Sequence, residues 1–229
     1  MKTAVIFGGT SGIGYGIARI LCKDHNTYIL GRTDHYDLGC HPNVTYMKYD
    51  ALSQDIPMID ADEIYITMGT GGLDYFEENT LEYIDRVIDL NCKVPIKIIK
   101  HYYDKIKSGE TKCCIITSIC GFVSSPLYSV YSASKAGLRY FIEGVNIELG
   151  KNKILNVAPG YIEGTSFRGD LTEFDKIKPL CKTIISELCN NNDLYIPEYD
   201  NVYKDVINRY IDDFRKFGEE SLRYKLRKK

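Results

Sequence analysis

Short apolar runs alternate with amphipathic stretches along most of the chain. The first run, residues 4–7, ends in glycines, and Ile13, Ile17 and Leu21 then fall on one face of a helix. We predict buried strands at 4–7, 27–30, 44–49, 63–67, 112–118 and 153–157. Strands that alternate with helices at this spacing are typical of βαβ units. The predicted fold class is therefore α/β: a doubly wound parallel sheet of the Rossmann type, with helices on both faces.

The helical stretches between these strands differ in length. Long helices are predicted over 80–107 and 128–149, and Pro95 is expected to bend or split the first of them. Between the third and fourth strands, residues 51–60 leave room only for a short helix interrupted by proline.

Beyond residue 166 the pattern weakens. Residues 167–192 are mixed in character, and a brief run at 194–197 is predicted to be the last strand. A single closing amphipathic helix follows, because apolar side chains recur there at helical spacing: Val202, Val206, Ile207, Tyr210, Ile211 and Phe214.

Length and composition are those of an ordinary globular domain. The chain has 229 residues, 44% of them hydrophobic and 26% charged, and nothing divides it, so we expect one domain over 1–229 with a variable region at 167–229. The net charge of −2 gives no sign of nucleic-acid binding. The last seven positions are rich in basic residues, and we expect a solvated tail there: Arg223, Lys225, Arg227, Lys228 and Lys229.

Other features exclude several kinds of site. No apolar run is long enough for a secretory core or a membrane span, so a cytoplasmic location without membrane contact is expected. The eight cysteines form no Cys-x-x-Cys pair and do not combine with the four histidines at ligand spacing. We therefore expect no metal site, and we interpret the cysteines as small apolar residues.

Glycines follow the first predicted strand at a spacing suited to phosphate binding. Gly8, Gly12 and Gly14 form a G-x-x-x-G-x-G pattern that leads into the first helix. Gly8 permits the sharp turn, while the other two let the backbone approach a pyrophosphate and pack closely on the sheet. N–H groups at the helix start, together with the hydroxyls of Thr10 and Ser11, would hold the phosphates. This context predicts a dinucleotide site.

The end of the second strand bears on the choice of dinucleotide. Sites that prefer NAD often place an acid there to bind the ribose 2′-hydroxyl. Here the strand ends at Gly31 and Arg32 follows, and a guanidinium suits a 2′-phosphate. NADP(H) is favoured for this reason. NAD(H) stays the alternative, because Asp34 stands two residues further on and an arginine in a turn is also compatible with simple solvent exposure.

Three polar residues suggest carbonyl chemistry. Tyr131 and Lys135 are four residues apart and therefore share one face of a helix, and Ser118 lies at the end of the fifth strand. A nearby ammonium favours the phenolate and lowers a tyrosine pKa, which is otherwise near 10. Tyr131 can then exchange a proton with the reacting oxygen while Ser118 orients that oxygen by a hydrogen bond. Alone, Tyr-x-x-x-Lys is also compatible with helix packing.

With these motifs the chain resembles the short-chain dehydrogenase/reductase family from its start to about residue 166. The matching pieces are Gly8-x-x-x-Gly12-Ile13-Gly14, Ile88-Asp89-Leu90-Asn91, Thr117-Ser118-Ile119-Cys120-Gly121, Tyr131-Ser-Ala-Ser-Lys135 and Asn156-Val-Ala-Pro159-Gly160. The resemblance implies that Ser118, Tyr131, Lys135 and Asn91 are catalytic, with Asn91 kinking the long helix and joining Lys135 through water.

The resemblance also implies contacts along the cofactor. Asp50 would contact the adenine, Pro159, Gly160 and Ile162 would border the nicotinamide, and Thr165 would lie near its carboxamide or the pyrophosphate. With Ile13, these residues complete the predicted cofactor set. Relatives usually pair through the helices matching 80–107 and 128–149, which implies a homodimer or homotetramer.

Three departures from the family pattern alter the expected cofactor cleft. Phe7 stands where the family usually has threonine, and Thr165 sits one residue late. The usual Asn-Asn-Ala-Gly after the fourth strand is replaced by residues 67–72 (Thr-Met-Gly-Thr-Gly-Gly). Small residues there, Gly69 among them, still let the chain pass close to the cofactor, but the amide contacts that stabilise the loop are lost.

The leading hypothesis is an NADP(H)-dependent oxidoreductase that interconverts a carbonyl and an alcohol. A cofactor-binding sensor or scaffold without turnover is the alternative, although such relatives often lack the tyrosine or the lysine, and both are present here. An enzyme acting on nucleotide-linked sugars ranks lower, because few residues follow Gly160. Tyr128 and Tyr161 are candidate pocket residues that favour ring or sugar stacking.

Overall fold

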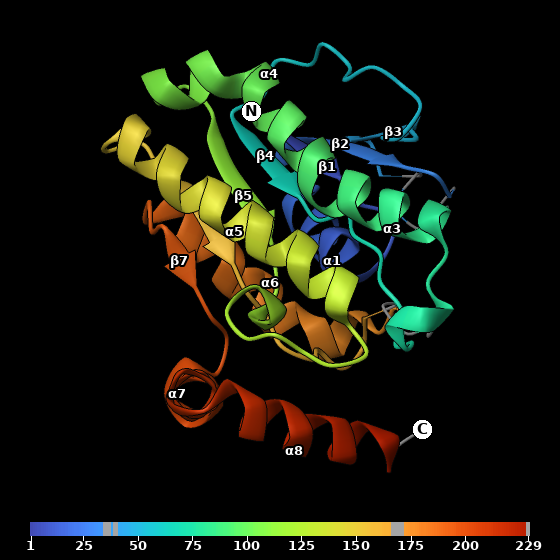
Figure 1. Ribbon diagram of the computed structural model, residues 1–229. Helices are drawn as coiled ribbons and strands as arrows, with labels where there is room; N and C mark the ends of the chain where they lie inside the picture. The colour runs from blue at the N-terminus through green and yellow to red at the C-terminus, as the bar shows by residue number, and fades with distance from the viewer. Residues whose placement is uncertain (34–37, 39–40, 166–171, 228–229) are drawn as a thin grey trace.

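A parallel sheet of seven strands forms the centre of this computed structural model, which describes residues 1–33, 38, 41–165 and 172–227. The strand order is β3-β2-β1-β4-β5-β6-β7, and each neighbouring pair runs parallel (Figure 1). The order reverses between β1 and β4, so the sheet is doubly wound as predicted. The strands are β1 Lys2–Phe7, β2 His25–Gly31, β3 Val44–Lys48, β4 Glu63–Ile66, β5 Lys112–Ile116, β6 Ile154–Val157 and β7 Leu194–Tyr195.

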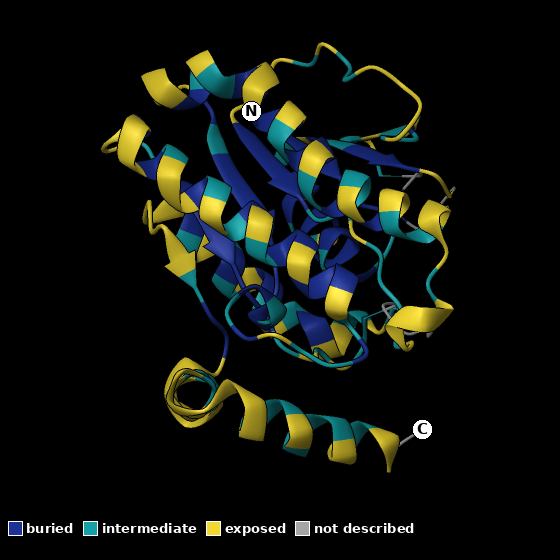
Figure 2. Cartoon of the chain, viewed as in Figure 1, coloured by how far each residue is buried: buried dark blue, intermediate teal, exposed yellow. Residues whose placement is uncertain are grey.

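Two helical layers cover the sheet, one on each face. Alternate side chains of β1 pack against different layers. Ala4 and Ile6 pack toward α1 (Gly12–Leu21) and α6 (Phe174–Cys189). Val5 and Phe7 pack toward the opposite layer, which holds α4 (Val94–Ser108) and α5 (Ser129–Leu149). The central strands β1, β4, β5 and β6 are buried almost throughout (Figure 2), as expected for a parallel sheet, whereas the edge strands β3 and β7 are partly exposed.

The region between β6 and β7 contains a helix that the sequence pattern did not predict. Helix α6 buries Ile177, Cys181, Ile184 and Leu188, which recur at helical spacing on one face. The pattern is hard to recognise because one of its members is a cysteine and because Pro179 lies inside the helix. This face packs on α1 beneath the glycine loop, where Cys181 Sγ lies 3.6 Å from the Ile13 carbonyl oxygen.

The long helical stretch after residue 80 is interrupted just before Pro95. Helix α3 (Leu81–Ile88) continues through a π-helical turn, Asp89–Lys93, into α4. Pro95 lies in the first turn of α4, where proline is tolerated because the N–H groups of a helix start need no helical partner. The predicted division of the helix is thus present, in the turn that ends two residues before Pro95. The implied irregularity at Asn91 is present.

Two further predictions about local structure are corrected. Residues 51–54 form a turn, and no helix is found over 51–60. The closing segment is two helices, α7 (Lys204–Asp212) and α8 (Phe214–Leu226), separated at Asp213, whose extended backbone ends one helix and whose carboxylate caps the next. The pair lies apart from the sheet layers in Figure 1. No helix in the described part of the chain is both long and apolar enough to cross a bilayer.

Candidate active site

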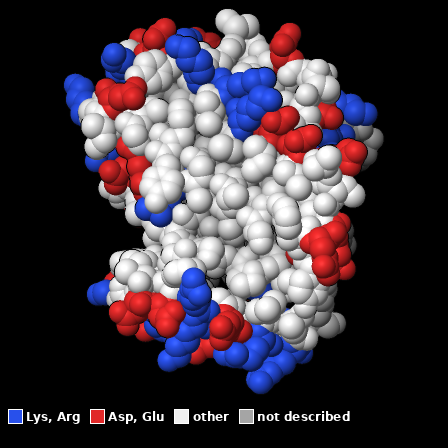
Figure 3. All heavy atoms as spheres, viewed as in Figure 1, with Lys and Arg blue, Asp and Glu red and all other residues white. Residues whose placement is uncertain are grey.

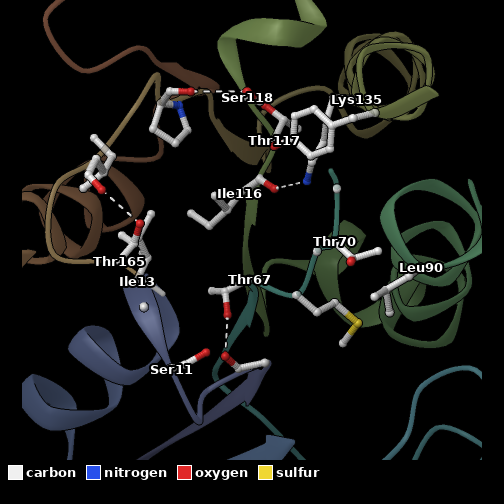
Figure 4. Close-up of a pocket in the computed structure, with 18 of the residues that line it drawn as sticks. Ser11, Ile13, Thr67, Thr70, Leu90, Ile116, Thr117, Ser118, Lys135 and Thr165 are labelled. Carbon is white, nitrogen blue, oxygen red and sulfur yellow. Dashed lines mark hydrogen bonds between the residues drawn. The ribbon is translucent and has the colours of Figure 1, made fainter. Parts of the chain in front are cut away.

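A cavity of about 530 Å³ opens at the carboxyl ends of the central strands. The loops after β1, β2, β4, β5 and β6 supply its walls, which is where a doubly wound sheet binds ligands (Figure 4). Most of the residues predicted for the site line it: Gly8, Thr10, Ser11, Gly12, Ile13, Arg32, Asp50, Gly69, Ser118, Tyr131, Lys135, Pro159, Gly160, Ile162 and Thr165.

Glycine is required by geometry at two points of the loop after β1. Gly8 has a φ of +91°, and a Cβ there would lie 2.7 Å from the Met68 nitrogen. A Cβ at Gly14 would lie 2.3 Å from Thr67 Oγ1 and 2.5 Å from the Gly8 carbonyl oxygen. Gly14 does not line the cavity itself. Its role is to let α1 approach β1 and the strand beside it, which brings the start of α1 to the cavity.

The start of α1 is arranged to receive an anion. Ser11 is the N-cap residue, but its side chain makes no capping hydrogen bond, and the first turn contains no acid. The positive end of the helix dipole therefore faces the cavity without a side-chain anion of its own. The Gly12 N–H donates to Thr172 Oγ1 at 2.8 Å. Thr172 was not among the predicted site residues, because a threonine so distant in sequence gives no signal by itself.

Thr67 supplies an anchor that compensates for one departure from the family pattern. Its hydroxyl donates to the carbonyl oxygens of Phe7 and Gly8, at 3.1 Å each (Figure 4). Phe7 has no hydroxyl and packs instead in the core, edge-on to Tyr49 with ring centroids 5.9 Å apart. The hydroxyl that fixes the glycine loop thus comes from the residue that follows the neighbouring strand, β4.

Arg32 and Asp50 lie at the end of the cavity formed by β2 and β3. Arg32 is exposed and follows Gly31, whose absent Cβ would contact Thr10. The Asp50 carboxylate accepts the Leu52 N–H at 3.1 Å. Both side chains line the cavity, as predicted. Asp34, the reason for keeping NAD(H) as an alternative, lies outside the described residues.

Ser118, Tyr131 and Lys135 meet at the other end of the cavity. Ser118 caps a short helical turn by accepting the Cys120 N–H at 3.1 Å, and its hydroxyl hydrogen-bonds that of Tyr131. The Lys135 ammonium donates to the Ile116 carbonyl oxygen at 3.0 Å (Figure 4) and lies 5.8 Å from the Tyr131 ring centroid. All three are at least nine-tenths buried, so their hydrogen bonds are strengthened by the low local dielectric.

Burial shifts the titration of this group. It raises the pKa of Tyr131 above its ordinary value, although the hydrogen bond from Ser118 acts in the opposite direction, so the lowering expected from Lys135 is not found. Burial also lowers the pKa of Lys135 from 10.5 to about 8, against smaller opposing effects of Cys120 and Cys92. At neutral pH the site therefore holds a protonated phenol beside an ammonium.

Asn91 lies behind this group, fully buried in the π-helical turn. Its carbonyl oxygen accepts the Thr70 N–H at 2.8 Å, and its amide nitrogen donates to the Thr70 carbonyl oxygen at 2.7 Å and to Ser134 Oγ at 3.1 Å. These hydrogen bonds hold the loop after β4 in place. They take over from the side-chain amides of the usual Asn-Asn-Ala-Gly sequence, which this loop lacks. A Cβ at Gly69 would lie 3.4 Å from Asn91 Oδ1 and 3.5 Å from Lys135 Nζ, so both side chains face that glycine.

The wall after β6 is closed from behind by the C-terminal region. Thr165 Oγ1 donates to the Ile162 carbonyl oxygen at 2.9 Å. A Cβ at Gly160 would fall 1.5 Å from Tyr203 Oη, so this tyrosine packs directly on the glycine. The cavity wall also includes residues that were not predicted to contact a ligand: Met68, Thr70, Gly71, Leu90, Ile116, Ile119 and Cys120. Most of them lie in the motifs and the 67–72 loop described above, but nothing in the sequence showed which members of those segments face the cavity. Tyr128 and Tyr161, proposed as pocket residues, do line it.

Comparison with known proteins gives consistent similarities. Residues 57–176, about half of the chain, match the family model for short chain dehydrogenases. Among curated proteins, the chain is 27% identical over 247 aligned positions to dehydrogenase/reductase SDR family member 4 of Homo sapiens, covering 85% of this chain and 83% of that protein. It is 26% identical to a 3-oxoacyl-[acyl-carrier-protein] reductase of Buchnera aphidicola, covering 82% and 84%.

Solved structures share the fold. A short chain dehydrogenase from Burkholderia cenocepacia in complex with NADP superposes with a TM-score of 0.76 at 18% identity, covering 96% of this chain and 97% of that one. An alcohol dehydrogenase from Thermococcus sibiricus complexed with 5-hydroxy-NADP gives 0.72 at 20% identity, covering 86% and 95%.

Proposed function

Because the chain belongs to the short-chain dehydrogenase family of NAD(P)-dependent oxidoreductases, we propose that it uses NADP(H) to interconvert a carbonyl and an alcohol. One observation carries the proposal. A single cavity joins the glycine loop and Arg32 at one end to Ser118, Tyr131 and Lys135 at the other. A dinucleotide that extends along it would bring its reactive ring to the hydroxyl pair.

The residues present fit a nicotinamide cofactor. The loop at Gly8–Gly12 lines the cavity, and the start of α1 has no capping bond from Ser11, an arrangement that suits its pyrophosphate. Arg32 would bind a 2′-phosphate, which is why NADP(H) is proposed over NAD(H), and Asp50 would contact the adenine. Pro159, Gly160, Ile162 and Thr165 would border the nicotinamide, which supplies or accepts the hydride when bound.

The catalytic roles follow from the arrangement of three side chains. Ser118 would hydrogen-bond the reacting oxygen and hold it against Tyr131. During reduction, Tyr131 Oη would donate its proton to that oxygen, and in the reverse direction it would take the proton back. Lys135 would favour the phenolate that is left and hold the ribose of the cofactor. Asn91 is proposed to keep the loop at Gly69 in place behind Lys135.

The substrate class is proposed from the cavity and the relatives together. Tyr128 and Tyr161 line the cavity, as does Cys120. Aromatic and acyl ketones are therefore the first candidates, since proteins similar to this chain include a hydroxynaphthalene reductase and a 3-oxoacyl-[acyl-carrier-protein] reductase.

We also propose self-association through the α4–α5 layer. Tyr140 and Ile147 on the outer side of α5 are 66% and 84% exposed. Figure 3 shows this face mostly free of charge in its middle, with charged side chains gathered toward the upper and lower rims. Depletion of charge at the centre is typical of interfaces. Ile147→Asp should shift a dimer or tetramer toward monomer in light scattering, whereas a wild-type monomer would contradict this part of the proposal.

A cofactor titration combined with a turnover assay tests the function. Purified protein is titrated with NADPH and NADH by fluorescence and assayed on aromatic ketones, 3-oxoacyl thioesters and simple aldehydes. Tyr131→Phe should bind NADPH as wild type does but lose turnover by about 100-fold or more, the range of one general acid. Tyr140→Phe, on the exposed side of the same helix, should change neither. Tight NADPH binding without turnover on any carbonyl would favour the sensor alternative.

A further inference from the structure

The C-terminal helix pair packs on the two segments that flank the substrate side of the catalytic group. Ile119 and Val123, just after Ser118, form a small apolar cluster with Ala158 and Ile196. Residues of α7 and α8 complete it: Val206, Ile207, Tyr210 and Phe217. The basic residues at this end were predicted to form a solvated tail. For Lys225 that prediction is wrong.

Lys225 reaches from the last turns of α8 to the loop before α5, residues 125–128. Its ammonium donates to Ser125 Oγ and to the Pro126 carbonyl oxygen, the latter at 2.6 Å. It also lies 5.0 Å from the centroid of the Tyr128 ring, within cation–π range. Burial lowers the pKa of Lys225, which indicates an ammonium that has given up part of its hydration for these contacts.

The loop that Lys225 holds has an unfavourable backbone conformation. Leu127 is buried and has a φ of +67°, which is uncommon for a residue with a branched side chain. Such a conformation persists only where surrounding contacts enforce it. The Asp74 N–H donates to the Leu127 carbonyl oxygen at 3.1 Å, and the Lys225 ammonium donates to the preceding carbonyl oxygen, that of Pro126. Helix α8 also runs near this loop at Gly218, where an added Cβ would make ordinary van der Waals contact with Pro126 at 3.9 Å.

Tyr128 connects this loop to the catalytic group. It is the N-cap residue of α5, its carbonyl oxygen accepts the Ser132 N–H at 2.7 Å, and both it and Tyr131 line the cavity. The two rings lie 5.9 Å apart, tilted by 57°. A change in the loop therefore moves an aromatic wall next to the reacting hydroxyl without touching the glycine loop at the other end.

We propose that Lys225 is a positioning residue for the substrate end of the site: it fixes the 125–128 loop, and with it the Tyr128 ring, beside Tyr131. The proposal rests on the function proposed above and adds a specificity role for the C-terminal helix. It implies that substrate binding depends on Lys225 and that cofactor binding does not.

The kinetic test compares Lys225→Met, Lys225→Arg and Lys216→Met, the last removing an exposed lysine from the same helix. We expect Lys225→Met to lower kcat/KM for the best carbonyl of the panel by about 10- to 100-fold, mainly through KM, as for the loss of hydrogen bonds to a charged group. NADPH affinity should stay within about twofold, and Lys225→Arg should recover most of the loss because it keeps the cation. The proposal would be overturned if Lys225→Met lowered NADPH affinity as much as kcat/KM for the carbonyl. Equal kinetic constants for Lys225→Met and Lys216→Met would overturn it as well.

Hydrogen–deuterium exchange tests the role of Lys225 in the loop without relying on catalytic activity. In Lys225→Met, exchange should rise in peptides that cover 122–131 and stay unchanged in the glycine loop, while Lys216→Met should match wild type. If the wild type reduces no carbonyl, the proposed function fails, and exchange still decides whether Lys225 holds the loop. Unchanged exchange over 122–131 would refute the positioning role whatever the activity.

Discussion

The side-chain amide of Asn91 pairs with both backbone groups of Thr70, at 2.8 and 2.7 Å. An amide that satisfies the N–H and the C=O of one residue acts like a strand partner for it. The pairing joins the π-helical turn to the loop after β4, so the irregularity in the helix and the altered loop are two parts of one arrangement. Asn146 pairs with Ile154 in the same way, away from the cavity, at 2.9 and 2.7 Å.

These two amides give a matched pair of substitutions. Asn91→Ala and Asn146→Ala should each lower the free energy of unfolding by about 1–3 kcal/mol, because each leaves backbone groups without a partner. Only Asn91→Ala should also weaken NADPH binding and slow turnover, since only its loop borders the cavity. Chemical denaturation and cofactor titration measure the two effects. Equal cofactor affinity in both variants would show that the Thr70 loop is not part of the site.

Arg32→Gln should change the preference between cofactors. Loss of charge-assisted hydrogen bonds to a 2′-phosphate should weaken NADPH binding by about 10- to 100-fold and leave NADH within about twofold. Arg86→Gln, an exposed arginine on α3, serves as the control. If NADH binding falls as far as NADPH binding, Arg32 contacts something common to both cofactors rather than the 2′ position.

Gly14→Ala should destabilise the protein and abolish cofactor binding. The added Cβ would lie 2.3 Å from Thr67 Oγ1, and the displacement needed to avoid this overlap should cost about 1–3 kcal/mol. Gly144→Ala, inside α5 with nothing within 4 Å of the new Cβ, should instead stabilise by about 0.5–1 kcal/mol. Thermal unfolding of the two variants provides the comparison, and a fall in Tm for both would contradict the packing argument.

The rate of carbonyl reduction should depend on pH through Lys135. Its pKa of about 8 means that the ammonium is present at neutral pH and lost as pH rises through that value. Tyr131, with its raised pKa, keeps the proton it must donate over the same range. The kcat/KM for reduction should therefore fall above about pH 8, while oxidation, which needs the phenolate, should rise with pH. A reduction profile that stays flat to pH 10 would exclude this role of Lys135.

The free energy of unfolding should also depend on pH through Lys135, and it should increase as pH rises from about 8 to 10.5. Between about pH 8 and 10.5 the unfolded chain binds a proton at Lys135 and the folded chain does not. The unfavourable burial of the charge is thus fully present below pH 8 and is relieved as pH rises through this window. In Lys135→Met this increase in the free energy of unfolding should be absent. Chemical denaturation of the variant and the wild type at pH 7 and pH 10 measures the increase in each.

Much of the fold could be predicted because the relevant signals are local. Strand β1 and the glycines after it are adjacent in sequence, and Tyr131 and Lys135 are one helical turn apart. The site residues implied by these motifs then come together because parallel strands end at one edge of the sheet. That physical rule needs no knowledge of side-chain contacts.

The errors arose where distant contacts decide the structure. Helix α6 tolerates Pro179 because its apolar face is buried against α1, a tertiary effect that outweighs local propensity. Asp213 separates two helices by capping the second, although the apolar spacing continues across it. Lys225 looks like a solvent-exposed tail residue in sequence, and only the fold shows that its partners lie about one hundred positions earlier.

On the proposed binding mode, a cofactor phosphate would take the Gly12 N–H, which donates to Thr172 Oγ1 in this structure. Cofactor binding would then exchange one hydrogen-bond partner for another, and Thr172 stands two residues before α6. We therefore expect arrival of the dinucleotide to be coupled to a rearrangement at Thr172. In rapid-mixing experiments the observed association rate should level off at high cofactor concentration, at the rate of that rearrangement, instead of rising in proportion to concentration as for a diffusional encounter.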